Sequence, residues 1–456
     1  MWKRRLPTLW VLAVVGMAGA AVWLLATDRF DDLRKRDPVP EAVPAGDVEM
    51  AWLHTSTNGT TWERFVKGLM ELDGNRGLTV DDAGAFKAAS TETPEVVLFR
   101  ASRPERRLRI RWYQLTSDWT AEKWVRAWEG RTPPLAFIGG GTSDRAKELA
   151  EALQEQHKDV ENGPLLFITT ATATGLTRIY PDRTFRFCFD NRRMAEAVVA
   201  FTRQTQPNAG EVGNFSVLWE DDPYSRNLHD CFRDVLGAAT PLRNFPVRHS
   251  IGGALQPNLE EAHAVAALAK VCSENPTQPV RLILPGVTQP SRRVLRALLE
   301  RVPTLRDRLT VLTGDGIPVN ALIRDSSFAW PFPALPVPLI LFAHNDPFDR
   351  KLDAGTEDVV HFKELGSIVA EALFGADGDE PAADPEQLRS GLRARRANTF
   401  DRDGERAAGS GEFVVHLRAV GAAAQLTAHR HEAGGAWLEQ ATVDIRGTVV
   451  RRPEAK

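Results

Sequence analysis

Short apolar runs alternate with longer amphipathic segments along most of the chain. Runs such as residues 135–141 (LAFIGGG) and 214–221 (NFSVLWED) are followed by segments with apolar residues at helical spacing over ten or more positions. Strands that are apolar on both faces, each followed by a helix, are typical of parallel sheets covered on both sides. The pattern therefore predicts an α/β protein with doubly wound parallel sheets.

These units are too many for one open sheet, so we expect two lobes joined by a hinge. The chain should cross to the second lobe between Phe185 and Asn191, where an expected helix is missing. Beyond residue 398 apolar and polar residues alternate, as in antiparallel strands. The predicted units are residues 1–29 (membrane anchor), 30–47 (Pro-rich charged linker), 48–375 (two lobes, the first 48–187 plus 335–375, the second 188–334), 376–398 (charged linker with room for a short helix) and 399–450 (a small β-rich C-terminal segment).

The N-terminus resembles a membrane segment. Three basic residues, Lys3, Arg4 and Arg5, precede an apolar run from Leu9 to Ala26, which is long enough as a helix to cross a hydrocarbon core. Positive charge before the run predicts a cytoplasmic start and an extracytoplasmic chain. A cleaved signal peptide is the alternative, because residues 18–20 (AGA) have the form of a cleavage site. We favour an uncleaved single-pass anchor in the inner membrane, because the apolar run continues past residue 20.

Composition excludes several functional classes. The 57 Lys and Arg nearly balance the 60 Asp and Glu of the 456 residues, so no strong field favours nucleic acid. Three separated cysteines, Cys188, Cys231 and Cys272, form no zinc motif, and we expect buried free thiols, with a single disulfide as the alternative. No nucleophile elbow, H-E-x-x-H helix or Cys/His pairing is present. We therefore expect no catalytic residue, no metal and no cofactor.

The loop at residues 139–144 (GGGTSD) joins a predicted strand to a predicted helix. In doubly wound sheets, ligands lie beyond the carboxyl ends of such strands. Gly139, Gly140 and Gly141 allow close approach to the backbone, Thr142 and Ser143 offer hydroxyls, and Ser143 or Asp144 can cap the helix. A tight turn with a cap is the alternative interpretation. The loop lacks the G-x-G-x-x-G and phosphate-loop patterns, which argues against a nucleotide.

Two further strand ends carry polar groups. Residues 170–173 (TATA) offer hydroxyls in a wall of small residues, and Tyr224 can present an aromatic face to a cleft. Asp222 before Pro223 signals the start of a helix. His344, Asp346 and Asp349, and also His429 and His431, lie together in sequence without a third metal ligand at suitable spacing, so we expect loop and strand-face residues there.

The three stretches FIGGGTSDRAKELAEAL, PLLFITTATATGLTRIYPDRTFRFCFDN and VLWEDDPYSRNLHDCF resemble the type I periplasmic solute-binding proteins, the family of the leucine/isoleucine/valine-binding protein and of related receptor ectodomains. The resemblance covers residues 48–375. It implies two α/β lobes that close on a small ligand. It also implies the ligand-binding positions, which are Gly140, Gly141, Thr142, Ser143, Thr170, Thr172 and Tyr224.

In amino-acid-binding members of that family, the Ser or Thr after the glycine loop and helix N–H groups hold the ligand carboxylate, and an acidic residue of the second lobe holds its amino group. Only Asp315 is available for the second role, which weakens the case for an amino acid as the ligand. We expect a membrane-tethered extracytoplasmic protein that binds a small polar or anionic ligand for an ABC-type importer or a signalling partner. A scaffold that has lost its ligand is the alternative, and an α/β enzyme is the third hypothesis.

Overall fold

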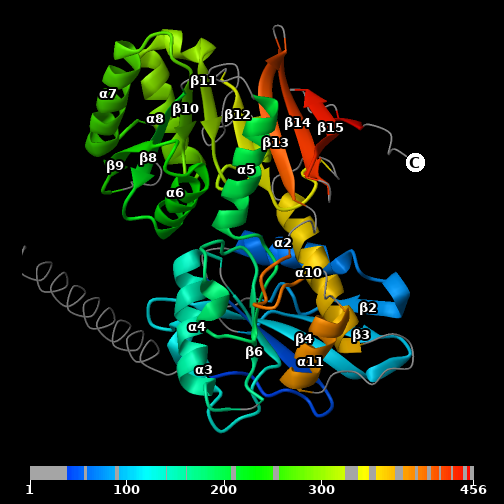
Figure 1. The fold of residues 1–456 in the computed structure, drawn as a ribbon. Helices are drawn as coiled ribbons and strands as arrows, with labels where there is room; N and C mark the ends of the chain where they lie inside the picture. Colours follow the sequence, from blue (N-terminus) through cyan, green and yellow to red (C-terminus); the bar gives the residue numbers. More distant parts are fainter. Residues whose placement is uncertain are drawn as a thin grey trace, which may run out of the picture.

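The described part of the chain contains two α/β lobes, one above the other in Figure 1. The computed structural model describes residues 39–55, 59–87, 92–139, 141–160, 162–206, 212–249, 256–323, 337–348, 356–374, 384–395, 399–407, 412–420, 423–432, 435–444 and 449–451. The predicted anchor, residues 1–29, lies outside these ranges. Within them, no helix has the length and apolar character needed to cross a membrane.

The first lobe is built around a seven-stranded sheet. Its elements are β1 (Val48–Thr55), α2 (Gly59–Met70), β2 (Leu78–Asp81), β3 (Glu95–Arg100), β4 (Arg103–Leu115), α3 (Ala121–Ala127), β5 (Ala136–Gly139), α4 (Ser143–His157), β6 (Leu165–Ile168), β7 (Thr184–Arg186), α10 (Thr356–Phe374) and α11 (Pro385–Arg395). The strand order is β2-β3-β4-β1-β5-β6-β7. The strands from β4 to β7 are parallel, as predicted, whereas β2 and β3 form an antiparallel edge that the sequence pattern did not predict.

The second lobe is built around a nine-stranded sheet in the order β16-β15-β14-β13-β12-β11-β10-β8-β9. Its elements are α5 (Asn191–Thr205), β8 (Gly213–Trp219), α6 (Pro223–Leu236), β9 (Leu242–Val247), α7 (Leu259–Glu274), β10 (Val280–Ile283), α8 (Thr288–Arg301), β11 (Leu309–Leu312), α9 (Asn320–Ile323), β12 (Leu339–Ala343), β13 (Phe413–Val420), β14 (Ala423–His431), β15 (Trp437–Asp444) and β16 (Val449–Arg451). The strands from β12 to β9 are parallel, and those from β13 to β16 are antiparallel.

Two boundaries differ from the sequence-based prediction. Strand β12 was assigned to the first lobe, but it pairs with β11 and belongs to the second sheet. The C-terminal strands were treated as a separate segment, but β13 pairs antiparallel with β12, so they extend the same sheet. The C-terminal segment therefore helps to build the second lobe, because it covers the edge that β12 would otherwise expose.

The chain passes between the lobes at β7, after β12 and again before β13. Helix α5 packs on the second lobe directly after the first passage, and α10 packs against α2 after the second. The segment 399–407 lies on the first lobe, where Gly404 accepts a hydrogen bond from the Arg186 backbone and Arg406 donates to the Phe187 carbonyl at 2.7 Å. These connections place the carboxyl ends of both parallel sheets at the boundary between the lobes (Figure 1).

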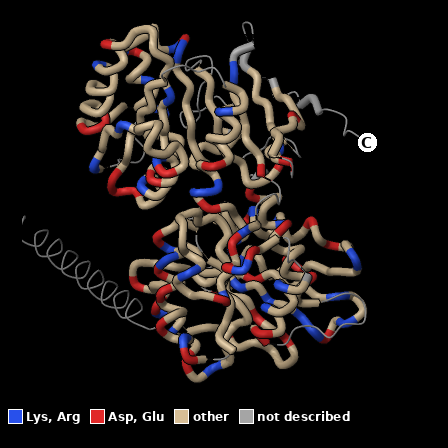
Figure 2. Tube along the Cα trace, viewed as in Figure 1, with Lys and Arg blue, Asp and Glu red and all other residues tan. Residues whose placement is uncertain are grey.

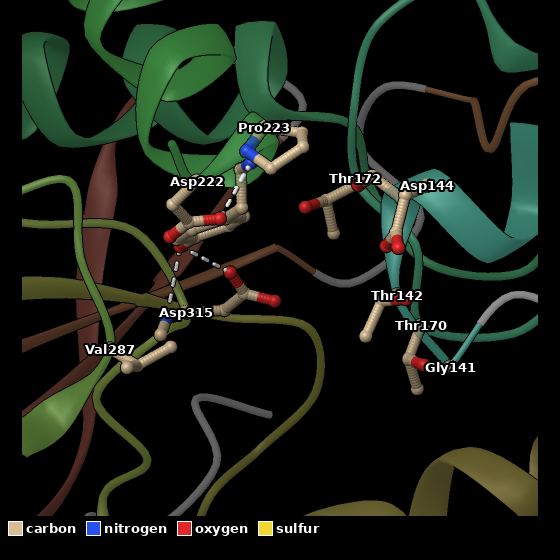
Figure 3. Close-up of a pocket in the computed structure, with 12 residues that line it drawn as sticks. Gly141, Thr142, Asp144, Thr170, Thr172, Asp222, Pro223, Val287 and Asp315 are labelled. Atoms are coloured by element: carbon tan, nitrogen blue, oxygen red, sulfur yellow. Dashed lines mark hydrogen bonds between the residues drawn. The ribbon is translucent and has the colours of Figure 1, made fainter. Parts of the chain in front are cut away.

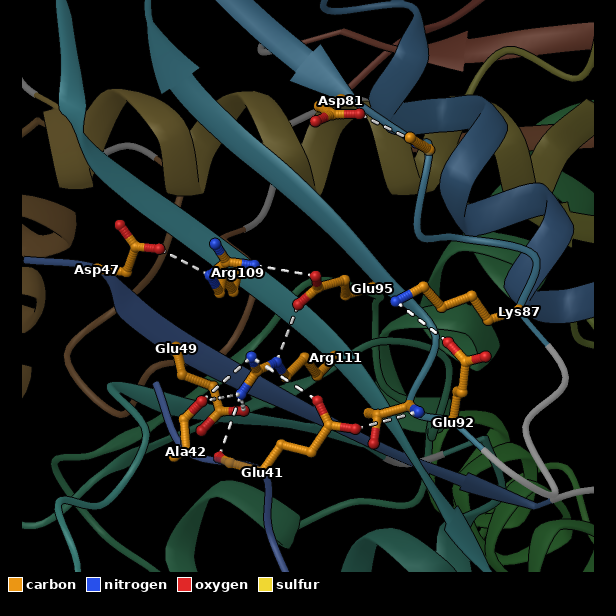
Figure 4. Close-up of polar contacts among 12 residues, drawn as sticks. Glu41, Ala42, Asp47, Glu49, Asp81, Lys87, Glu92, Glu95, Arg109 and Arg111 are labelled. Atoms are coloured by element: carbon orange, nitrogen blue, oxygen red, sulfur yellow. Dashed lines mark hydrogen bonds and ion pairs between the residues drawn. The ribbon is translucent and has the colours of Figure 1, made fainter. Parts of the chain in front are cut away.

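The end of the predicted N-terminal linker is bound to the first lobe. Residues 39–47 are mostly exposed, as expected for a spacer, but buried Arg111 donates to the Glu41 carbonyl at 3.2 Å and pairs with Glu49 at 3.3 Å (Figure 4). Arg109 pairs with Asp47 at 2.7 Å. These contacts lie at the amino end of β1, so the N-terminal segment enters the first lobe on the side opposite the cleft.

Both lobes have dense apolar cores and mixed surfaces. In the first lobe, the Trp52 ring stacks on Trp62 and Phe65 with centroids 4.9 and 4.8 Å apart. The three cysteines are buried and free, which confirms the expectation of free thiols. Figure 2 shows basic and acidic residues interspersed over both lobes, as the balanced composition predicts.

Candidate functional site

A cavity of about 260 Å³ lies between the two lobes at the carboxyl ends of their parallel strands (Figure 3). Both lobes line it. The lining residues are Gly141, Thr142, Ser143, Asp144, Thr170 and Thr172 from the first lobe, and Asp222, Pro223, Tyr224, Val287, Asp315 and Gly316 from the second. This is the position at which doubly wound sheets bind ligands.

The glycine loop after β5 forms part of the first-lobe side. Thr142 is the N-cap of α4 but makes no side-chain capping bond, and Ser143 is the first helical residue rather than the cap. The Ser143 hydroxyl instead accepts a hydrogen bond from the Ala173 N–H at 3.2 Å, which joins this loop to the one after β6. A side chain at Gly141 would not fit, because its Cβ would lie 2.6 Å from Nε2 of His54.

The loop after β6 supplies the threonines. The Thr172 carbonyl accepts a hydrogen bond from the Asn191 N–H at 2.7 Å, and the Thr169 carbonyl accepts one from Nε2 of His361 at 2.8 Å. The backbone of this loop is therefore fixed from behind. The Thr172 side chain is 2% exposed, and its hydroxyl points toward the second lobe in Figure 3.

The second-lobe side is a chain of hydrogen bonds from strand ends β8, β11 and β12. The Tyr224 hydroxyl donates to Oδ1 of Asp315 at 2.8 Å and accepts from the Gly316 N–H at 3.0 Å. Oδ2 of Asp315 lies 2.9 Å from Nε2 of His344. Because Nδ1 of His344 accepts from the Phe189 N–H at 3.1 Å, Nε2 carries the proton and donates to Asp315.

These bonds set the charge states. Burial tends to raise the pKa of Asp315, but the hydrogen bonds from His344 and Tyr224 outweigh it, so the pKa is lowered. Burial, together with the adjacent Asp315 charge, raises the pKa of Tyr224 well above its ordinary value. At neutral pH the second-lobe side therefore presents a neutral phenol and an ionised carboxylate.

One group of hydrogen bonds joins the lobes directly at the rim of the cavity. Asn227 of α6 accepts from the Thr174 N–H at 3.0 Å and donates to the Thr174 hydroxyl at 2.9 Å. Within the second lobe, the Asn191 amide donates to Oδ1 of Asn227 at 3.0 Å and holds this side chain in place. The two sides of the cavity are thus held in contact across the boundary.

The structure places most of the predicted positions around this one cavity. Gly141, Thr142, Ser143, Thr170, Thr172 and Tyr224 all line it. Gly140 lies outside the described residues. Whether these residues bind a ligand stays a prediction.

Sequence reasoning missed other lining or supporting residues. Asp144 and Asp222 were noted only as helix-start signals, although Asp222 does cap α6 by accepting from the Tyr224 N–H at 3.0 Å. Asp315 is predicted only as the one acidic residue available to hold an amino group, and it is not among the predicted binding positions. His344 was interpreted as a loop residue, and it faces Asp315 rather than a metal; among the described residues no group of three metal-ligating side chains occurs. The sequence signal that could have identified Asp315 and His344 is their position directly after the predicted strands β11 and β12.

Solved structures share this architecture. A leucine-, isoleucine-, valine-, threonine- and alanine-binding protein from Brucella ovis, in a closed conformation, aligns with a TM-score of 0.56 at 13% identity, over 90% of this chain and 99% of its own. A leucine-binding protein from Thermotoga maritima gives 0.55 at 13% identity, over 87% and 98%. The chain has the fold of the type I periplasmic binding proteins.

A solved structure with a different kind of ligand shares the same fold. An ABC-transporter solute-binding protein from R. palustris, in complex with 4-hydroxybenzoate, aligns with a TM-score of 0.51 at 9% identity, over 90% of this chain and 98% of its own. No family model and no curated protein matches the chain. At these identities the shared feature is the fold, and the site must be judged from its own residues.

Proposed function

We propose that this protein binds a small polar ligand in the cavity between its lobes and closes on it, and that it does not transform the ligand. We further propose that residues 1–29 tether it to the inner membrane, that the lobes lie outside the cytoplasm, and that it serves ABC-type uptake or a signalling partner. Hinge closure of two lobes needs only that the ligand bind the closed form more tightly than the open form.

The observation that carries the proposal is a cavity lined from both lobes by groups suited to a ligand. Thr142, Ser143 and Thr172 offer hydroxyls from the first lobe, and Tyr224 offers an aromatic face from the second. A ligand that bridges these groups would stabilise the closed form. The solute-binding proteins that share the fold are consistent with this use of the cleft.

A ligand-free scaffold is the second candidate, and one observation favours it. The bonds between Thr174 and Asn227 join the lobes directly through protein groups. In a scaffold these contacts would suffice to fix the lobes, and the hydroxyls around the cavity would have no binding role.

Ligand screening on the purified full-length chain distinguishes the two. We expect some members of a collection of amino acids, amines, carboxylates and sugars to raise the melting temperature and to reduce the radius of gyration. Removing the Thr172 hydroxyl in Thr172→Val should weaken the best of them by about tenfold.

A matched substitution controls for general effects. Thr427 of β14 is also buried, and its hydroxyl has no hydrogen-bond partner in the described part of the chain, but it lies in the C-terminal part of the second sheet. Thr427→Val should leave ligand affinity unchanged. If no compound binds, the scaffold function is favoured. If a compound binds and Thr172→Val binds it like the parent, the Thr172 hydroxyl does not contact the ligand.

A further inference from the structure

The charged side chains that line the cavity have one sign. Three lining residues are aspartates, Asp144, Asp222 and Asp315, and within the described chain no lysine, arginine or histidine lines the cavity. Asp144 extends from the first turn of α4, and Asp222 is the N-cap of α6. Figure 3 shows them on opposite sides of the cavity, one from each lobe.

Two basic side chains close to these elements, Arg186 and Arg145, are engaged with carboxylates. Arg186 is buried behind the loop after β6, where it donates to the Ala173 carbonyl at 2.7 Å and lies 3.0 Å from a Glu405 oxygen. Arg145 of α4 pairs with Glu148 at 2.8 Å. Within the described residues, neither Arg186 nor Arg145 pairs with Asp144 or Asp222.

The helix termini do not reverse the sign. Helices α4 and α6 both begin at the cavity, and each N-terminus contributes roughly half a positive charge. Set against three carboxylates, the two termini leave a balance of about two negative charges. In α6 the first N–H groups are also unavailable to an anion, because Pro223 has none and the Tyr224 N–H is bonded to Asp222.

A second feature indicates that the cavity is built for a polar ligand. Thr172 is 2% exposed, and no hydrogen bond to its hydroxyl is found within the described residues. This hydroxyl is not among the fully enclosed side-chain atoms that lack a partner, so it is accessible from the cavity. This hydroxyl points into the cavity (Figure 3), where it can accept a hydrogen bond from a ligand.

Building on the function proposed above, we propose that the ligand is a small organic cation. It carries an ammonium or guanidinium group and no free carboxylate. Asp144 and Asp222 hold the cationic group from the two lobes, and the Thr172 hydroxyl accepts one of its hydrogen bonds. The ligand thereby offsets the repulsion between the two aspartates, which couples its charge directly to closure of the lobes.

Three compounds with one carbon skeleton test the charge. Leucinamide is a cation, leucine a zwitterion and 4-methylpentanoate an anion at neutral pH. Calorimetry on the full-length protein should detect binding of leucinamide, at least tenfold weaker binding of leucine and none of 4-methylpentanoate. A wider thermal-shift collection of amines, guanidines, amino acids, carboxylates and sugars should give ligands confined to the cations, with agmatine included as the guanidinium probe.

Variants locate the effect. Asp222→Asn should weaken the best cation by about tenfold, while the protein stays folded because asparagine caps helices as well as aspartate does. Asp144→Asn should act in the same direction. The neighbouring Asp221, which does not line the cavity, provides the matched control, and Asp221→Asn should change affinity less than about twofold at physiological salt.

The outcomes separate this inference from the function on which it rests. If carboxylates or zwitterions bind and Asp222→Asn leaves or improves their affinity, the ligand class is wrong but the cleft still binds a solute. If cations bind and both aspartate variants are without effect, the cationic group lies elsewhere and the inference also fails. If no class of compound binds, the binding function itself is overturned.

Discussion

The two sides of the cavity are built differently. We call Thr142, Ser143 and Thr172 the first-lobe wall, and Tyr224, Asp315 and His344 the second-lobe wall. The first-lobe wall consists of short side chains on loops whose backbones are fixed from behind. Among the residues that the structure describes, its Thr172 hydroxyl has no hydrogen-bond partner. In the second-lobe wall each polar group already has one, from Tyr224 through Asp315 and His344 to the Phe189 N–H.

This difference suggests a division of roles. A ligand gains most from groups that are unpaired before it arrives, because groups already bonded must first be released. The first-lobe wall is therefore suited to initial capture, and the second-lobe wall to covering the captured ligand with a rigid aromatic surface. His344 also ties the second-lobe wall to Phe189, which lies on a segment that passes between the lobes.

The largest expected effect comes from breaking the second-lobe wall. In Asp315→Asn the amide can accept from Tyr224 or from His344 but not from both, so one buried donor loses its acceptor. With the loss of a charged hydrogen bond added, we expect a destabilisation of roughly 3 kcal/mol. Thermal melts would report it as a fall of roughly 6–12 °C.

The matching change in the first-lobe wall is much milder. Ser143→Ala removes one neutral hydrogen bond from the Ala173 N–H, so it should cost about 1 kcal/mol. Equal losses of melting temperature in the two variants would contradict the distinction between the walls.

Acid should affect the two walls in different pH ranges. Burial, with a smaller contribution from the Arg406 charge, lowers the pKa of His361 to about 3. Its neutral ring supports the first-lobe wall through the Thr169 carbonyl. When the pKa of a histidine is lower in the folded than in the unfolded protein, the full stability of the fold is present above the unfolded pKa. As the pH falls below that value, the unfolded state takes up a proton that the folded state does not, so stability is lost until the pH reaches the folded pKa. Lowering the pH from 6.5 to 5 should therefore reduce the free energy of unfolding by about 2 kcal/mol through His361 alone.

The second-lobe wall should resist the same change. The pKa of Asp315 is lowered from its ordinary value of 3.8, so its contribution to the free energy of unfolding is retained throughout the range from pH 7 to 5. His361→Gln keeps a donor for the Thr169 carbonyl but cannot titrate, so its urea midpoint should fall less than that of the parent between pH 7 and 5. His416, whose pKa burial lowers to about 4, titrates in both proteins and cancels in the comparison. Identical pH dependence in the two proteins would show that His361 does not stay neutral.

The two walls also differ in how far the sequence predicts them. The first-lobe wall follows β5 and β6 directly, so small and hydroxyl-bearing residues after two apolar runs are enough to locate it. The second-lobe wall joins residues after β8, β11 and β12, which come together only through the strand order of the sheet. Because β12 was assigned to the first lobe, His344 was separated from Asp315 in the prediction.

The same limit applies to the fold as a whole. Apolar runs and helical spacing predict parallel strands covered by helices, because each such signal is local. The antiparallel edge strands β2 and β3 and the pairing of β13 with β12 depend on contacts between distant segments. Alternation in the C-terminal residues predicts strands there but cannot say which sheet they extend.

The smallest effect on stability should come from the contact that joins the walls. Asn227→Ala removes both bonds to Thr174 and the one from Asn191, all at the partly exposed rim, so it should cost no more than about 1 kcal/mol of unfolding free energy. Of these bonds, the two to Thr174 form only when the lobes meet, so their loss should shift the balance between closed and open forms up to about fivefold toward open. Small-angle scattering on ligand-free protein should therefore give a larger radius of gyration for Asn227→Ala at nearly unchanged melting temperature.

Asp234→Ala, at an exposed position later in the same helix, should match the parent in both measurements. A radius that does not change would mean that the walls stay together without this bridge, and the hinge would then have no open form for a ligand to close.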